Sequence, residues 1–277
     1  MNNPPGRMAG LLLGLLLAAP GALAEGISNP RIDGNSLKAD LALGSASATL
    51  TVQFDNVIGL SFENLGLSVE SIKPLDAAFL SRLGADASLP AAFPLLIRIE
   101  PPASGGLTFS GVVSIEIYTH DLHYAPGSLL RMYSAPSGGA FSDITTSEGS
   151  GSYRSGGTKG NFSEFLIATD LRTVQAAVDS KYARLSQLLA GHASKIDGVI
   201  QIELSQLHSA SFDAWQGEDL VAAIQHVEAF DDKVREHSGD GIPDVWRSTG
   251  DLSNVAGELR AAAATLRFSL TQASNAL

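Results

Sequence analysis

The chain has no cysteine in 277 residues. That absence excludes disulfides, thiolate zinc sites, iron–sulfur clusters and cysteine nucleophiles, so an apolar core alone, or a metal, must hold the fold together. Positive charge is scarce as well, since 18 Lys and Arg stand against 29 Asp and Glu and the formal net charge is −11. Nucleic acids and anionic lipids are bound through clustered Lys and Arg, so neither is expected as a partner.

Long hydrophobic runs are missing except at the N-terminus. There, residues 8–19 are mostly leucine and alanine, and they follow one basic residue, Arg7. A run of about 12 apolar residues is too short to cross a bilayer, which needs roughly 20. Ala22 and Ala24 supply small residues at positions −3 and −1 of a signal peptidase site. We therefore predict cleavage before Glu25 and an exported protein, located in the periplasm or outside the cell.

The first half of the chain alternates between apolar and polar residues, which is the pattern of strands with one buried face. The alternation runs on both sides of Gly44 and predicts a β-hairpin there. Many short strands separated by Gly, Ser and Pro are typical of an antiparallel sandwich, with a closed barrel as the alternative. Further strands are expected over residues 95–99, 113–118, 129–133, 152–155 and 162–168, and a short helix over residues 75–83.

The period changes at Asp170, after which apolar residues recur at every third or fourth position. These residues form an apolar stripe over positions 171–207. The stripe predicts one helix of about 40 residues over residues 170–210 or, alternatively, two helices joined near Gly191. We favour the single helix because the stripe keeps its phase. A helical hairpin is expected over residues 218–275.

Together these patterns predict three segments. They are a signal peptide over residues 1–24, an all-β immunoglobulin-like sandwich over residues 25–169 and an all-α antiparallel helical region over residues 170–277. The stripe at 171–207 is either a core seam against the helical hairpin or a coiled-coil surface for self-association.

Several short motifs resemble known proteins. Residues 97–102 and 106–112, Ile-Arg-Ile-Glu-Pro-Pro and Gly-Leu-Thr-Phe-Ser-Gly-Val, resemble a strand–Pro–Gly–strand pattern in immunoglobulin-like modules of bacterial surface proteins. Residues 161–165 resemble the closing strand of those modules. Residues 243–247 and 254–259 are similar to an uncharacterised family of exported proteobacterial proteins, a domain of unknown function that covers most of the mature chain. The resemblance implies export and this architecture, and it assigns no residues and no activity.

Signatures of catalysis and of cofactor binding are missing. The sequence has no Gly-x-Ser-x-Gly elbow and no Ser-x-x-Lys pair, which mark two large groups of hydrolases. The glycine-rich stretch 149–160 does not join a strand to a helix, as a phosphate-binding loop would. We therefore predict no catalytic residues, no cofactor and no enzymatic activity.

Three short motifs look like sites but lack part of the chemistry. His120 and His123 flank Asp121, yet a third metal ligand is not evident near them. Residues 239–244 space aspartates with glycines as calcium loops do, but no terminal glutamate follows, so a helix–helix turn is expected. The glycosylation pattern at residues 161–163 contains a phenylalanine that fits a core strand. We predict no metal site.

The preferred interpretation is a non-enzymatic binding or structural module at the cell envelope, with an unknown partner at its loops or strand edges. The alternative is an extracytoplasmic hydrolase with a site in the sandwich loops that includes His120, Asp121 and His123. A third interpretation, a periplasmic carrier of a small ligand, requires a pocket between the two halves of the chain.

Overall fold

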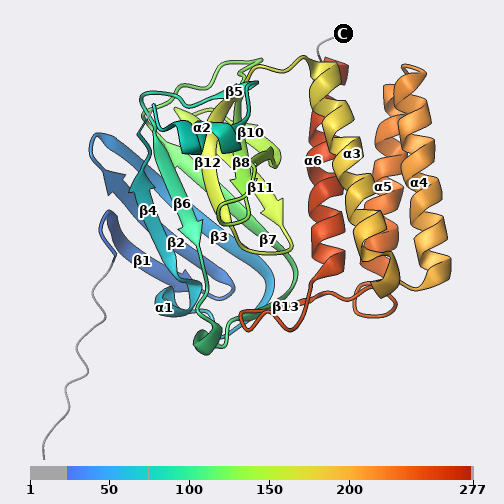
Figure 1. The fold of residues 1–277 in the computed structure, drawn as a ribbon, viewed down its shortest axis with the longest axis horizontal. Coiled ribbons are helices and arrows are strands. Elements are labelled where there is room, and N and C mark those ends of the chain that lie inside the picture. Colours follow the sequence, from blue (N-terminus) through green and yellow to red (C-terminus); the bar gives the residue numbers. More distant parts are fainter. Residues whose placement is uncertain (1–23, 74, 276–277) are drawn as a thin grey trace, which may run out of the picture.

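The computed structural model describes residues 24–73 and 75–275, and it contains two packed antiparallel sheets followed by four long helices (Figure 1). Of the residues at the predicted cleavage site, Ala22 lies outside the described residues, whereas Ala24 and Glu25 lie just before Gly26 and the first strand. The signal peptide therefore stays a prediction.

Sheet A has the strand order β1-β2-β3-β7-β11-β10, with β13 paired to β7. The hairpin predicted around Gly44 is confirmed: Leu37 of β2 lies opposite Val52 of β3, and both are fully buried. Gly44 begins the tight turn with a φ of 64°, a left-handed conformation that glycine adopts without steric cost. The strands are β1 (Ile27–Asp33), β2 (Ser36–Leu43), β3 (Ala46–Ile58), β7 (Thr108–Thr119), β10 (Thr145–Gly149), β11 (Tyr153–Lys159) and β13 (Val245–Arg247).

Sheet B has the order β4-β6-β12-β8-β9, and β5 pairs with β12. Side chains from both sheets form one buried core between them, and a second cluster on the other face of sheet B is covered by helix α2. The elements of this part are α1 (Phe62–Leu65), β4 (Leu67–Ser71), α2 (Ala77–Leu83), β5 (Ala87–Ser88), β6 (Leu95–Ile99), η1 (Ala103–Gly105), β8 (Leu130–Ala135), β9 (Ser142–Asp143) and β12 (Glu164–Asp170).

The helices form an antiparallel bundle beside the sandwich, and α6 is the helix that packs against β7, β10 and β11 (Figure 1). Apolar side chains of all four helices make a separate core. None of the described helices is both long and apolar enough to span a membrane. The helical elements are α3 (Val174–His192), η2 (Ala193–Lys195), α4 (Gly198–Gln216), α5 (Leu220–Glu236) and α6 (Val255–Asn275).

The single helix expected over residues 170–210 is wrong, and the alternative of two helices is confirmed. The chain turns between α3 and α4, where Ile196 is extended and Asp197 caps the new helix by accepting from the Val199 amide at 2.9 Å. The break could not be recognised from apolar spacing, because Ile196 and Ile200 on its two sides are both buried and are four residues apart, as in a continuous helix.

The apolar stripe at 171–207 lies mostly inside the chain's own bundle. Val178, Tyr182, Leu185, Leu189 and Ile196 belong to the four-helix core, whereas Val199 and Ile202 are 66% and 60% exposed and lie outside it. Leu171 and Val174 at its start are half exposed. The interpretation as a core seam is therefore the one that the packing supports.

The helical region is anchored to sheet A at the start of α6. The Asn254 side chain accepts from the Gly257 amide at 2.7 Å and donates to the Gly111 carbonyl of β7 at 2.6 Å. It thus caps α6 and ties the helix to the sandwich at the same time. Next to this anchor, Trp246 of β13 stacks on Phe109 of β7, with ring centroids 5.4 Å apart. The two halves of the chain therefore share one extended interface.

Candidate functional site

A cleft of about 720 Å³ lies between the sandwich and the helices, and it is lined by residues of both halves. The sandwich contributes the segment after α2, the ends of β8 and β11, β9 and the turn from β11 to β12. The bundle contributes one face of α3 and the first half of α6. Cavities of this size hold small-molecule ligands in many proteins.

Glycine allows the backbones to approach closely at one wall of the cleft. A side chain at Gly160, in the turn after β11, would overlap the backbone of Glu258 in α6. A side chain at Gly257 would overlap the Gly111 carbonyl. The first turn of α6 is therefore held directly on the sandwich, and this contact fixes the position of the cleft wall.

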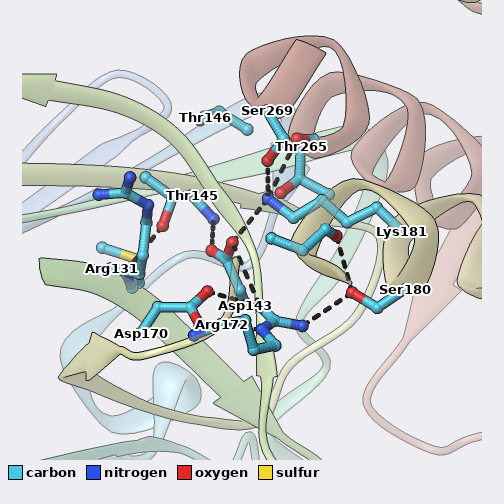
Figure 2. Close-up of polar contacts among 12 residues, drawn as sticks. Arg131, Asp143, Thr145, Thr146, Asp170, Arg172, Ser180, Lys181, Thr265 and Ser269 are labelled. Carbon is cyan, nitrogen blue, oxygen red and sulfur yellow. Dashed lines mark hydrogen bonds and ion pairs between the residues drawn. The ribbon is translucent and has the colours of Figure 1, made fainter. Parts of the chain in front are cut away.

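A buried ion pair belongs to the lining of the cleft, and Figure 2 shows its contacts. Lys181 of α3 lies 2.6 Å from the Asp143 carboxylate of β9, and the two side chains are 4% and 2% exposed. The ammonium also donates to Ser269 Oγ at 2.7 Å and to the Thr265 carbonyl at 3.2 Å, both in α6. The pair thus joins sheet B to two helices.

Asp143 carries its charge in this pair. Burial pushes the pKa of its carboxyl upward, but Lys181 and the Thr145 amide, which donates at 2.8 Å, together bring that pKa below its ordinary value. Burial pulls the pKa of the Lys181 ammonium the opposite way, downward. We consider the pair ionised because the ammonium has three acceptors and the carboxylate has two donors.

Arg172 extends this network along the linker between β12 and α3. Its guanidinium makes two bonds to the Asp170 carboxylate, at 2.6 and 2.9 Å, and donates to Ser180 Oγ at 2.7 Å (Figure 2). The same guanidinium lies 4.0 Å from Asp143. The bidentate geometry holds Arg172 in one orientation, so its charge is already compensated within the chain.

Glu258 forms a second polar link across the cleft. Its carboxylate accepts from Asn161 Nδ2 at 3.1 Å and lies 3.0 Å from His192 Nε2. Asn161, the residue of the predicted glycosylation pattern, is therefore engaged in the contact between the β11–β12 turn and α6. Through Glu258 this contact reaches the end of α3.

Lys159 and Arg184 differ from the other basic residues of the cleft. Both line it, Lys159 from the end of β11 and Arg184 from α3, and within the described residues neither makes an ion pair or a side-chain hydrogen bond. Burial and, to a smaller extent, the charge of Arg184 lower the pKa of Lys159, the charge of Glu258 opposes them, and the resulting pKa is about 8. Sequence patterns gave no signal for either residue.

The residues of the predicted hydrolase alternative do not come together in a triad. The Asp121 carboxylate accepts from the Ser47 amide at 2.6 Å and from Thr119 Oγ1 at 3.4 Å, in the turn region of sheet A. His120 instead contacts Ser152, with Nδ1 2.8 Å from Oγ. His123 is exposed, and the described residues contain no group of three His, Cys, Asp or Glu that could hold a metal.

The segment at residues 239–244 is a turn, but it joins α5 to the strand β13 and does not lead directly into a helix as expected. Gly239 and Gly241 have φ values of 80° and 93°, and the Gly239 amide donates to the Ile242 carbonyl at 2.9 Å. Asp244 accepts from Ser238 Oγ at 3.2 Å. These contacts make the glycines and aspartates parts of a chain reversal.

Two packed antiparallel sheets followed by a helical bundle, with a cleft at the junction, define the class of this protein. Residues 12–274 match a family of unknown function, DUF6689, and the chain belongs to that family. The match spans both halves and so covers all the walls of the cleft. No curated protein matches the chain.

Proposed function

We propose that this protein is an exported, non-enzymatic binding module of the cell envelope that holds a small ligand in the cleft between its sheets and its helices. The observation that carries the proposal is the cleft of about 720 Å³ with one wall from each half of the chain. Its volume falls in the range of known ligand sites.

The rigid construction of the cleft supports the proposal. The Lys181–Asp143 pair and the glycine contacts of α6 fix the two walls relative to each other. A preformed site binds with little loss of conformational entropy. Lys181 and Asp143 in its lining are tied to each other as a structural pair, which favours binding over catalysis.

Export and the immunoglobulin-like character of the sandwich are further parts of the proposal. The apolar run at residues 8–19 with small residues at Ala22 and Ala24 supports a cleaved signal peptide. The antiparallel pairing in both sheets supports an immunoglobulin-like arrangement.

A fragment screen by ligand-observed NMR tests the binding proposal with a matched pair of variants. Ala183 is exposed on α3 and lines the cleft, so Ala183→Trp places a large side chain in it. Ala190 is exposed on the same helix outside the cleft, and Ala190→Trp is the control. We expect fragments that bind the wild type and Ala190→Trp but not Ala183→Trp. Fragments that bind all three equally would refute the proposal.

The hydrolase alternative has one observation in its favour, the contact between His120 Nδ1 and Ser152 Oγ at 2.8 Å. Ser152 has a φ of 88°, which is a strained conformation for a serine. Ester, glycan and peptide substrates incubated with the wild type, His120→Ala and Ser152→Ala test this reading. Turnover that both substitutions abolish would establish it, and turnover that neither changes would remove it.

A further inference from the structure

The charge balance of the cleft is opposite to that of the whole chain. Four basic side chains line it against three acidic ones, whereas the sequence has 18 basic and 29 acidic residues. Two of the basic side chains, Lys181 and Arg172, are neutralised by carboxylates. The remaining two, Lys159 and Arg184, make no ion pair and no side-chain hydrogen bond within the described residues, and the other two carboxylates of the lining belong to Asp86 and Glu258.

Lys159 is held in this position at a cost to stability. A half-buried ammonium loses hydration, and Lys159 gains neither an acceptor nor a carboxylate in return within the described residues. The nearby Glu258 carboxylate is engaged with Asn161 and His192 instead. Charged groups kept in a cleft against the stability of the fold are typical of binding sites.

The cleft also offers an apolar surface beside these charges. Leu83 and Phe141 of the sandwich and Leu188 of α3 are among the lining residues. Thr158 and Thr265 are also lining residues, and their hydroxyls are buried without a hydrogen-bond partner among the described residues. A ligand with one charged end and a hydrocarbon part would contact both kinds of surface.

We infer that the ligand is a small organic anion, whose carboxylate or phosphate group binds Lys159 and Arg184 while its hydrocarbon part packs on Leu83, Phe141 and Leu188. This inference rests on the proposed function, because it names the ligand class of the same cleft. Arg184 contributes planar donors suited to an oxyanion, and Lys159 contributes a compact point charge.

Calorimetric titration with four probes of equal chain length tests the inference. Hexanoate and hexyl phosphate carry the anion, hexanol lacks the charge, and hexylamine reverses it. We expect the full protein to bind one or both anions in the millimolar range or better, and to bind hexanol and hexylamine at least about tenfold more weakly. The stronger of the two anions identifies the oxyanion as a carboxylate or a phosphate.

Variants then locate the charge. Lys159→Met and Arg184→Gln should each weaken anion binding by about tenfold to a hundredfold, the effect of one charge-assisted hydrogen bond. Lys195→Gln, at an exposed lysine outside the cleft, should leave it unchanged. Equal binding of hexanol and hexanoate, no effect of either cleft variant, or no binding of any probe would overturn the inference. The fragment screen with Ala183→Trp decides the proposed function separately, since it does not depend on ligand charge.

Discussion

Lys159→Met keeps most of the side-chain length in the cleft and removes its charge. In the wild type the pKa of Lys159 is about 8 against an ordinary 10.5, so the fold holds this proton more weakly than the unfolded chain does. This difference in pKa means that the charge of Lys159 lowers the free energy of unfolding by at most about 3 kcal/mol. Because the side chain is only half-buried and water screens it, we expect Lys159→Met to stabilise the protein by about 1 kcal/mol.

The gain should depend on pH in a defined direction. Below the folded pKa of about 8, both states carry the charge and the cost is fully present. As the pH rises toward 10.5, the folded chain loses its proton first and the cost disappears. The charged groups that act on Lys159 are Arg184 from α3 and Glu258 from α6. The advantage of the variant is therefore largest at and below pH 7 and close to zero near pH 10.5.

Circular dichroism during thermal and urea unfolding measures this gain. For a chain of this size, about 1 kcal/mol corresponds to a rise in Tm of roughly 2–4 °C. Lys195→Met is the control, because Lys195 is exposed and lies outside the cleft, and its effect should stay within about 0.5 kcal/mol. A Lys159→Met protein that is less stable than the wild type at pH 7 would refute the reasoning, since it would show that the ammonium has a stabilising partner.

Three other predictions concern the buried ion pair of the cleft, the contact with α6 and the N-terminus. Asp143→Asn should lower the free energy of unfolding by about 3–5 kcal/mol in urea titrations, because it leaves Lys181 buried without a counter-ion. Adding Lys181→Met to this variant should recover much of the lost stability. Because folding lowers the pKa of Asp143, its carboxylate stabilises the fold above about pH 4, and this stabilisation is lost as the pH falls further. A wild-type free energy of unfolding that does not change below about pH 4 would contradict this. Gly160→Ala should lower the free energy of unfolding by about 1–3 kcal/mol because its side chain would overlap α6. Gly191→Ala has open space around it and should stabilise α3 by about 0.5–1 kcal/mol. Equal effects of the two variants in thermal unfolding would argue against the close contact at Gly160. N-terminal sequencing of the protein exported from a Gram-negative host should begin at Glu25, and a product that begins at Met1 would rule out cleavage.

Residue periodicity was enough to predict most of the central strands and the C-terminal helices. The strands around Gly44 alternate clearly because one face of sheet A is buried in the common core. The strand at residues 95–99 is apolar at four of its five positions because both faces of sheet B are covered. Strands β1 and β4 were missed because their burial does not alternate regularly. Strand β13 was missed because a strand of three residues is too short to show an alternating pattern, and its pairing with β7 depends on the tertiary structure.

The cleft could not be predicted from the sequence in the same way. Its charged residues come from the segment after α2, from β9, β11, the linker and two helices, and Asp86 and Glu258 are separated by more than half of the chain. Lys159 and Arg184 look like ordinary surface residues in a strand end and a helix. What distinguishes them is the absence of a counter-ion within the described residues, and only the packing of α3 and α6 on the sandwich reveals it.

The most direct test of the proposed anion site is the titration of Lys159 by heteronuclear NMR on lysine-labelled protein, with Lys159→Met to assign its signal. We expect a pKa of about 8 for the free protein and a higher value when hexanoate or hexyl phosphate is bound, because an anion in the cleft stabilises the charged ammonium. A pKa near the ordinary 10.5 that neither anion moves would contradict both the unpaired charge and the anion site.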